Sequence, residues 1–252
     1  MLPYHISTQI PTGFAYGNPV NSVSRPVDTN SYQSIVGSLL YAAITTRLDI
    51  AQAVGVVSTF CANPTQSHLT ATKRILKYLK GTVYVGLSYK KCADGNLIGY
   101  SDADWAGDVE DRHSTSGNVV LLAKGAVSWL SKKQVTVALS TTEAEYVSLS
   151  TATQEAIWLR RLLTDVGKPL EEPIVINEDN QGAIAMAKNP VGHARTKHID
   201  IRYHFVCEGV QDGAIILKYV ATGEMITDIL TKPLPKHPFE NLVIQLGMKT
   251  VK

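Results

Sequence analysis

A run of short strand-like segments constrains the fold of this chain more than any other feature of its 252 residues. Asp94-Gly95 and Lys124-Gly125 lie between these segments and are hairpin-turn signals. Turns this short join antiparallel neighbours, because a parallel connection needs about a dozen residues or more. The run therefore predicts an antiparallel meander. Its strands are expected from about Val83, at 86–89, 97–101, 117–122 and 126–130.

A long helix after the meander sets the fold class. Ser140 and Glu143 form a capping box, and we expect the helix to reach Gly167, with Arg160 and Arg161 near its end. A long helix between a meander and later strands predicts an α/β fold, in which helices flank a mixed sheet. The further elements expected are strands at 173–177 and 214–220 and helices at 180–188, 198–211, 222–230 and 239–246.

The segment before the sheet, residues 31–82, has helical periodicity. Apolar residues recur at three- and four-residue intervals from Ile50 to Phe60, and Asp49 is the expected cap. Another helix is expected to start after Thr65 and to end at Gly81. The segment predicts a small helical bundle. Its last helix should bury Leu69, Thr72, Leu76 and Leu79 and expose a basic stripe of Lys73, Lys77 and Lys80.

Charge is divided unevenly along the chain. Residues 1–100 hold 8 Lys/Arg against 3 Asp/Glu, whereas residues 101–252 hold 16 against 19. A basic segment beside an acidic one suits a metal-dependent nuclease, because phosphates bind Lys and Arg while carboxylates bind Mg²⁺. Solvated surface charge explains the same composition equally well.

Other features limit the class of protein. Residues 1–30 are rich in Pro, Gly, Ser, Thr and Asn without an apolar period, which predicts a flexible arm. The 3 cysteines have no paired spacing, so neither a disulfide framework nor a zinc ribbon is expected. No run of about 18 apolar residues and no secretory signal pattern is present, so we expect a soluble protein without a membrane span.

Acidic residues occupy positions that a nuclease active site would use. Asp102 and Asp104 follow a central strand, Glu145 lies in the first turn of the long helix, Asp179 ends a buried strand, and Asp228 lies on the penultimate helix. Each has an ordinary explanation when taken alone: turn formation, the helix dipole, capping or a solvated face. Their chemical meaning therefore depends on the motifs around them.

Those motifs, in their order, resemble the ribonuclease H region that ends the Pol polyprotein of Ty1/copia-type retrotransposons. YQSIVGSLLY, TRLDIAQAV and ATKRILKYLKGT resemble the thumb and connection after a reverse-transcriptase palm. YSDADWAGD, LSTTEAEY, EDNQGAI, ARTKHIDIRYHF and ITDILTKPL resemble the blocks of the nuclease. The chain departs from the family at Met225, where Gln is usual, and at Glu178, where Cys is frequent.

The resemblance implies a division into an arm at 1–30, a helical thumb/connection remnant at 31–82 and a ribonuclease H-like domain at 83–252 with a five-stranded mixed sheet. It also implies an endonuclease that cuts the RNA strand of RNA–DNA hybrids and leaves 3′-hydroxyl and 5′-phosphate ends. Its catalytic and metal-binding residues would be Asp102, Glu145, Asp179 and Asp228. These would hold two Mg²⁺ about 3.5–4 Å apart, with Mn²⁺ as a substitute; one ion activates water and the other stabilises the leaving oxygen.

Within this set we expect Asp102 to bridge the two ions, Glu145 and Asp179 to hold the leaving-group side, and Asp228 to hold the attacking-water side. Hybrid contacts are expected from Thr142, Asn180, Gln181, Arg195 and Lys197 and from the stripe of Lys73, Lys77 and Lys80. Capping by Asn180 and Gln181 and solvated charge at Arg195 and Lys197 are the alternatives.

His193, His198 and His204 lack a cysteine at zinc-ligand spacing, so surface positions, or one histidine assisting product release, are preferred over a zinc site. The tryptophans Trp105, Trp129 and Trp158 are interpreted as packing residues rather than base-stacking platforms.

Two other functions compete with the nuclease. One is a catalytically inactive module that binds hybrids, and the other is a helical interaction domain. By analogy with the family, the partners expected are the RNA–DNA hybrid and, in a polyprotein, the reverse-transcriptase palm and fingers; the location expected is cytoplasmic virus-like particles.

Overall fold

A five-stranded mixed sheet forms the centre of the computed structural model, which describes residues 27–90, 95–189 and 197–251. Its strand order is β4-β3-β2-β5-β6. The strands are β2 (Ile98–Asp104), β3 (Thr115–Leu122), β4 (Gly125–Lys133), β5 (Ile174–Glu178) and β6 (Ile215–Tyr219). The helices around it are α1 (Thr29–Thr45), α2 (Ala51–Ser58), α3 (Gln66–Gly81), α4 (Thr141–Asp165), α5 (Gln181–Lys188), α6 (Lys197–Gln211), α7 (Asp228–Thr231) and α8 (Lys236–Gln245).

The direction of each strand follows from the length of its connection. β2, β3 and β4 are antiparallel neighbours, whereas β5 pairs in parallel with both β2 and β6, after helical crossovers. The β3–β4 turn contains Ala123 and Lys124, both at positive φ (52° and 63°), as a tight hairpin of right-handed strands requires. The turn therefore lies one residue earlier than Lys124-Gly125. The mixed α/β sheet expected from the sequence is confirmed.

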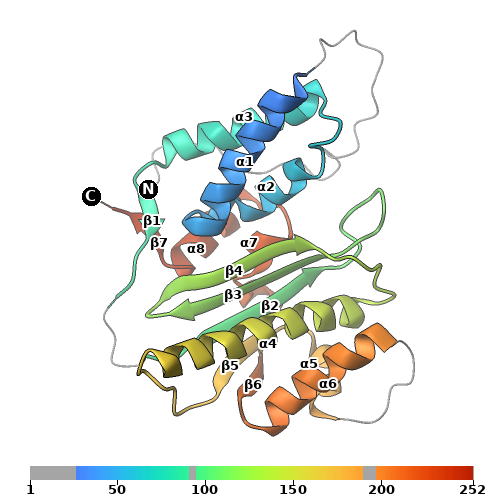
Figure 1. Ribbon diagram of the computed structural model, residues 1–252, viewed down its shortest axis with the longest axis vertical. Helices are drawn as coiled ribbons and strands as arrows, with labels where there is room; N and C mark the ends of the chain where they lie inside the picture. Colours follow the sequence, from blue (N-terminus) through green and yellow to red (C-terminus); the bar gives the residue numbers. More distant parts are fainter. Residues whose placement is uncertain (1–26, 91–94, 190–196, 252) are drawn as a thin grey trace.

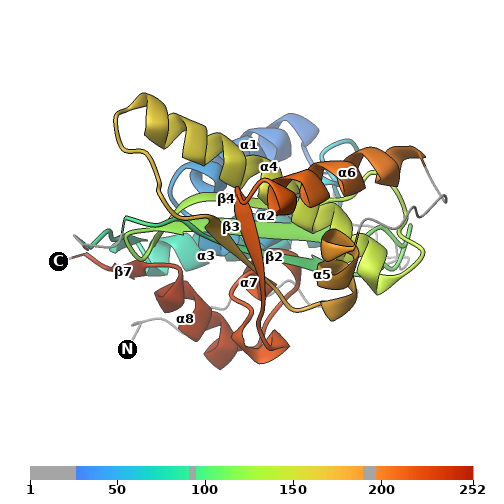
Figure 2. The same ribbon diagram turned by 90° about the horizontal axis from the view of Figure 1, so that it is seen from below.

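Each face of the sheet is covered by its own set of helices (Figure 1). On one face, α4, α5 and α6 pack a core with β5 and β6 that includes Leu149, Ile176 and Ile215, all fully buried. Figure 2 shows α4 and α6 lying across this face. On the other face, α1, α2 and α3 share a core with α7, α8 and the meander, through residues such as Ile50 and Leu230. The boundary at residue 82 remains a prediction.

The helical segment differs from expectation at two positions. Asp49 does not cap α2. Its carboxylate accepts hydrogen bonds from Arg47 Nε (2.9 Å) and from the Tyr78 hydroxyl (2.7 Å), and the residue is 3% exposed. α3 begins after Thr65 as expected, but it buries His68, Ala71, Thr72, Ile75 and Tyr78, while Leu76 is exposed. The buried face is rotated because the helix packs around Tyr78 and its bond to Asp49.

α4 has the expected limits but different end contacts. The Ser140 hydroxyl accepts from the Glu143 backbone N–H (3.2 Å), whereas the Glu143 carboxylate accepts from Leu139 N–H (2.9 Å), so the reciprocal capping box is incomplete. Gly167 adopts φ 78° just beyond the helix, the left-handed conformation that glycine permits. Arg160 donates to the carbonyls of Leu170, Glu172 and Ala214 and ties the following loop to α4.

Two further predictions are wrong. The first strand, β1 (Val85–Leu87), does not join the meander but pairs with β7 (Met248–Thr250) in a separate two-stranded sheet. The helix expected at 222–230 is divided into a 3₁₀ turn at Thr222–Glu224 and α7, and Thr222 makes no cap. Met225 and Ile226 between them are buried, so packing of this connector replaces the continuous helix.

The tryptophan interpretation holds for one of three side chains. Trp129 packs against the core shared with the helical segment, and its Nε1 donates to Ala43 O (2.8 Å). Trp105 and Trp158 are 46% and 54% exposed, so neither is a core residue. Within the ranges that the structure describes, no helix combines the length and apolar character needed to cross a membrane.

Candidate metal and catalytic site

The parallel pairing of β2 with β5 brings Asp102 and Asp179 to one edge of the sheet. Ile98 pairs with Val175 and Tyr100 with Asn177, so the same register sets Asp102 level with Asp179. Glu145 enters from the first turns of α4, which packs over β2 and β3. One carboxylate oxygen from each of Asp102, Glu145 and Asp179 lies within 4.8 Å of the others. Three separate elements thus place three predicted residues together.

α7 supplies the fourth predicted residue. Gly117, opposite Asp102 on β3, allows this approach, because a Cβ there would lie 2.6 Å from Thr231 Cγ2. Asp228 is the first residue of α7 and acts electrostatically on both Asp102 and Asp179. It is paired with Lys232, whose Nζ lies 2.8 Å from Asp228 Oδ1. Asp228 therefore lies beside the cluster of Asp102, Glu145 and Asp179, on the side of α7.

Three of the four carboxylates lie in an environment that opposes their ionisation. Burial raises the pKa of Asp102 to about 7, against the hydrogen bond from Thr231, which lowers it. Burial and the charges of Glu178 and Asp102 raise the pKa of Glu145 to about 10. Burial also raises the pKa of Asp228, although Lys232 lowers it. Acids this close to one another and this dry need added positive charge to be ionised together.

The donor set fits hard divalent cations. Asp102 and Glu145 are 3% and 7% exposed, and the buried Glu145 Oε2 has no hydrogen-bond partner among the described residues. A buried carboxylate oxygen without a partner costs free energy unless a cation or donor reaches it. Oxygen-only clusters of this kind suit Mg²⁺ and Mn²⁺ rather than zinc.

The sequence motifs did not lead us to predict three of the residues that lie at this site. The Thr231 hydroxyl donates to Asp102 Oδ2, Lys232 pairs with Asp228, and Glu178 is fully buried beside the cluster. Glu178 Oε1 accepts from Asn180 N–H (3.1 Å), and burial together with the charges of Asp179 and Asp102 raises its pKa. The motifs ITDILTKPL and EDNQGAI contain all three, so adjacency to a predicted ligand was the available signal.

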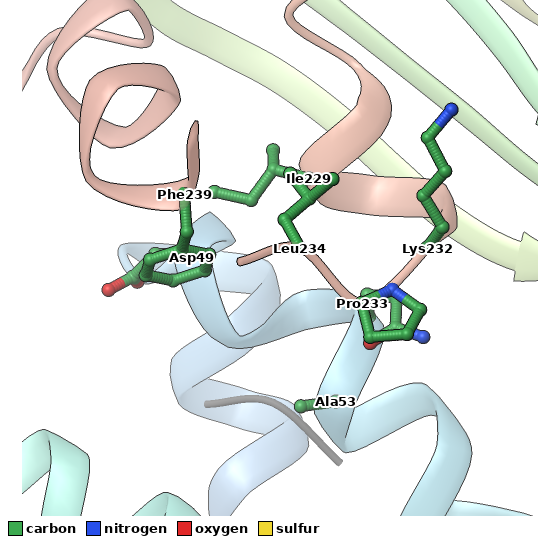
Figure 3. Close-up of a pocket in the computed structure, with 8 residues that line it drawn as sticks. Asp49, Ala53, Ile229, Lys232, Pro233, Leu234 and Phe239 are labelled. Atoms are coloured by element: carbon green, nitrogen blue, oxygen red, sulfur yellow. The ribbon is translucent and has the colours of Figure 1, made fainter. Parts of the chain in front are cut away.

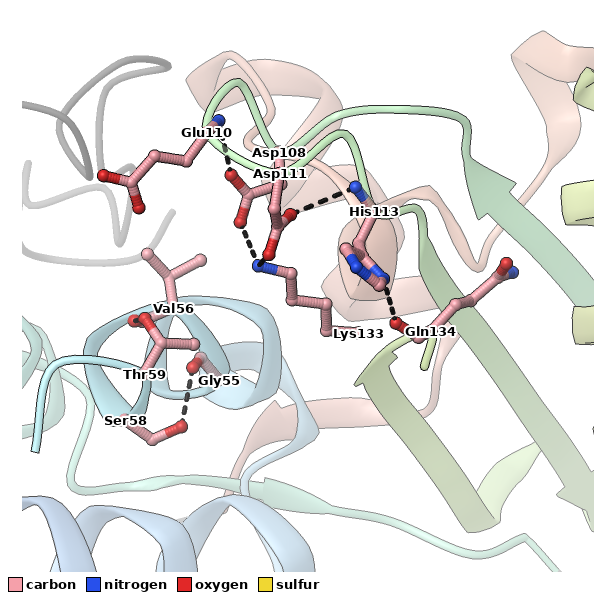
Figure 4. Close-up of polar contacts among 10 residues, drawn as sticks. All are labelled: Gly55, Val56, Ser58, Thr59, Asp108, Glu110, Asp111, His113, Lys133 and Gln134. Carbon is pink, nitrogen blue, oxygen red and sulfur yellow. Dashed lines mark hydrogen bonds and ion pairs between the residues drawn. The ribbon is translucent and has the colours of Figure 1, made fainter. Parts of the chain in front are cut away.

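The loop that follows Asp104 is fastened to β4. Lys133 forms ion pairs with Asp108 and Asp111, the latter at 2.6 Å, and His113 Nδ1 lies 2.6 Å from Gln134 O (Figure 4). Asp104 itself is half-buried, and burial raises its pKa while Lys232 lowers it. The Lys133 contacts fasten this loop to β4 and involve none of the four predicted carboxylates.

The predicted nucleic-acid contacts divide into three groups. Thr142 and Asn180 meet at the starts of α4 and α5, with Thr142 Oγ1 3.4 Å from Asn180 Oδ1. Asn180 also caps α5, because its Oδ1 accepts from Ala183 N–H (3.0 Å), and Gln181 is exposed. Lys73, Lys77 and Lys80 are exposed along α3. Arg195, His193 and the side chains of Lys197 and His198 lie outside the described residues.

A small cavity lies between α2 and the α7–α8 connection. Asp49, Ala53, Ile229, Lys232 and Phe239 are among its lining residues (Figure 3). Its volume of about 10 Å³ admits about one water molecule. The cavity is too small for a nucleotide, so the cluster of Asp102, Glu145 and Asp179 is the better candidate site.

The chain is thus an α/β protein with a buried carboxylate group at the edge of a mixed sheet. It is 46% identical over 230 residues to the retrovirus-related Pol polyprotein from transposon RE1 of Arabidopsis thaliana, covering 91% of this chain and 16% of that protein. It is 47% identical over 217 residues to the corresponding polyprotein from transposon TNT 1-94 of Nicotiana tabacum, covering 86% and 16%. The chain belongs to the retrovirus-related Pol polyproteins of the Ty1/copia type, and it spans about one sixth of their length.

Solved structures offer weaker likenesses. A ribonuclease H1 isolated from compost, LC11-RNase H1, aligns with 54% of this chain and 93% of its own at 13% identity, with a TM-score of 0.42. No family model matches the chain.

Proposed function

We propose that this chain is a ribonuclease H that hydrolyses the RNA strand of RNA–DNA hybrids with two divalent ions, leaving 3′-hydroxyl and 5′-phosphate ends. The observation that carries the proposal is the convergence of Asp102, Glu145 and Asp179 within 4.8 Å, with Asp228 beside them. These are the residues at which the Pol motifs place the catalytic carboxylates. The resemblance to the Pol motifs supports all four positions, and the cluster geometry supports Asp102, Glu145 and Asp179.

Each carboxylate has a distinct part in holding the ions. Asp102 is clustered with Glu145 and Asp179 and is also influenced by the charge of Asp228, so it is the residue suited to bind both ions. Glu145 and Asp179 would hold the ion on the leaving-group side, and Asp228 the ion on the water side. When bound, Mg²⁺ or Mn²⁺ supplies the positive charge that activates water and stabilises the leaving oxygen. Thr231 keeps Asp102 aimed at the site through its hydrogen bond.

Substrate contacts are proposed on both sides of the carboxylates. Thr142, Asn180 and Gln181 lie at the starts of α4 and α5, next to Asp179, where hydroxyl and amide groups suit the 2′-hydroxyls of an RNA strand. The exposed stripe of Lys73, Lys77 and Lys80 suits phosphates, as do Arg195 and Lys197. Hybrid shape rather than base identity would then determine binding.

The proposed setting is a Pol polyprotein. The relatives carry that name, and this chain spans 16% of each, so the palm and fingers of a reverse transcriptase are the proposed intramolecular partners. The proposed location is the cytoplasmic virus-like particle, in which reverse transcription takes place.

A substrate comparison tests the activity. The purified chain is incubated in Mg²⁺ with an end-labelled RNA–DNA hybrid, a duplex RNA and a duplex DNA of the same sequence. Cleavage confined to the RNA strand of the hybrid, with 3′-hydroxyl products and none in chelator, is the expected result. A folded chain that binds the hybrid in a gel shift but cuts no substrate would overturn the proposal in favour of an inactive binding module.

A further inference from the structure

Lys232 lies where a cation would otherwise be needed at the carboxylate group. It follows α7 directly, and its Nζ lies 2.8 Å from Asp228 Oδ1. Its charge also acts on Asp102 and Asp104, on the same side of the site. An ammonium group is a compact point charge that can hold several carboxylates at once. The Lys232 ammonium therefore compensates the negative charge of the carboxylates on the α7 side of the cluster.

The side of the cluster around Glu145 has a different balance of positive and negative charge. Of the ion pairs formed by described residues, the one at this cluster joins Lys232 to Asp228. Glu145 is surrounded by the charges of Glu178, Asp102 and Asp179, and its buried Oε2 is without a described partner. The two sides are thus unequal before any metal binds: among the described residues, Asp228 forms an ion pair with a lysine, and Glu145 forms none.

We propose that Lys232 occupies the cation position at Asp228 until it is displaced, so that the chain binds its two divalent ions in sequence. The first ion binds at Asp102, Glu145 and Asp179, because the ion pair that Lys232 forms is with Asp228 and not with any of these three. The second reaches Asp228 only when the ammonium moves away, because an ammonium and a divalent ion on one carboxylate repel each other. This inference rests on the proposed function, in which these carboxylates bind metal.

Lys232 has the freedom that displacement requires. Its side chain is 33% exposed, so its flexible four-carbon stem has a path to solvent, whereas Asp228 is only 15% exposed. An ordinary surface pair at this i,i+4 spacing would contribute little to stability and would have no effect on metal binding. The half-buried setting and the shared influence on Asp102 distinguish Lys232 from such a pair.

The test counts bound Mn²⁺ by electron paramagnetic resonance of the free ion, without nucleic acid. The wild-type chain should bind one ion, with a second much weaker. In Lys232→Met the second ion should bind about tenfold tighter or more, because its competitor is gone. Lys232→Arg should resemble the wild type. Lys236→Met is the matched control, since Lys236 pairs with Glu240 at 4.0 Å on α8 and should leave the titration unchanged.

Two further results keep the inference separate from the proposed function. Asp228→Asn combined with Lys232→Met should return the chain to one tight ion, which also controls for a folding defect in the single variant. A Lys232→Met titration that superimposes on the wild type, or two equal ions in the wild type, would overturn sequential binding even if the hybrid is cut. Failure to cut the hybrid, with sequential Mn²⁺ binding intact, would overturn the activity alone.

Discussion

The Thr231 hydroxyl donates a hydrogen bond to Asp102 Oδ2 across 129 residues of sequence. Asp102 belongs to the central strand β2 and Thr231 to the short helix α7, so this bond joins the two elements that frame the metal site. Thr231 is 1% exposed and Asp102 is 3% exposed. The bond satisfies one buried carboxylate oxygen and leaves the remaining acceptor capacity of Asp102 for a cation.

Replacing Thr231 by Val should remove this bond while keeping the shape of the side chain. Partners that orient a metal ligand are typically worth about 10–100-fold in metal affinity or activity, and a loss of that size is expected in hybrid cleavage. Thr231→Ser keeps the hydroxyl and should retain most of the activity. The Mg²⁺ concentration for half-maximal rate should rise in Thr231→Val; an unchanged value with a full rate contradicts the positioning role.

The free energy of unfolding of the metal-free chain should fall as the pH rises. Burial raises the pKa of Asp102 to about 7 and that of Glu145 to about 10, well above their values in an unfolded chain. The folded chain then binds more protons than the unfolded chain, so the free energy of unfolding falls as the pH rises above about 4. The loss continues through about pH 7 for Asp102 and towards pH 10 for Glu145. Each carboxyl contributes at most about 1.4 kcal/mol per pH unit.

Urea unfolding in chelator, repeated between about pH 5 and pH 8, measures this slope. Glu145→Gln should flatten it, and Mg²⁺ should do the same in the wild type, because a cation favours the ionised carboxylates. Stability that rises across this window in chelator would show that the cluster is ionised without metal.

Glu178 should be dispensable for catalysis although it lies beside the ligands. It is fully buried, and one of its oxygens has no described partner, so a neutral side chain should be easier to accommodate. Glu178→Gln keeps the acceptor for Asn180 N–H and should cleave hybrid within a few-fold of the wild type. It should also raise the metal-free melting temperature at pH 8. Loss of cleavage as complete as in Glu145→Gln would make Glu178 a ligand.

The lysine stripe of α3 should contribute affinity by neutralising phosphates. Changing Lys73, Lys77 and Lys80 together to Gln should weaken hybrid binding and reduce the slope of log affinity against log salt by up to about 0.9 for each phosphate that is no longer neutralised. Fluorescence anisotropy over a range of salt concentrations measures both quantities.

A matched triple change at exposed lysines elsewhere controls for net charge. Lys168, Lys218 and Lys249 are exposed and do not belong to α3, and their replacement by Gln should change the salt slope much less. Equal slopes for the two triple variants would show that α3 has no special part in binding.

Local patterns predicted the strands of the five-stranded sheet and the helix α4, which carries Glu145. Turn signals, the Ser140 cap and Gly167 are read from neighbouring residues, and they set the limits of β3, β4 and α4 to within a few residues. The parallel pairing of β2 with β5, which brings Asp102 level with Asp179, joins strands that are distant in the sequence, so these local patterns do not encode it.

The contacts that escaped prediction are made between distant segments. Asp49 accepts a hydrogen bond from Tyr78 instead of capping α2, and β1 pairs with β7 near the C-terminus. Thr231 reaches Asp102 only because Gly117 permits the approach of α7. Tertiary packing decides such pairings, and no periodicity along the chain encodes them.

Single-turnover cleavage of a labelled RNA–DNA hybrid in Mg²⁺ by the wild type and Asp179→Asn tests the central claim most directly. Asp212→Asn serves as the control, since Asp212 is exposed at the end of α6. If Asp179 is a catalytic metal ligand, Asp179→Asn should fold and bind the hybrid but lose cleavage, while Asp212→Asn should cut the hybrid like the wild type. Undiminished cleavage by Asp179→Asn would contradict the assignment of the site.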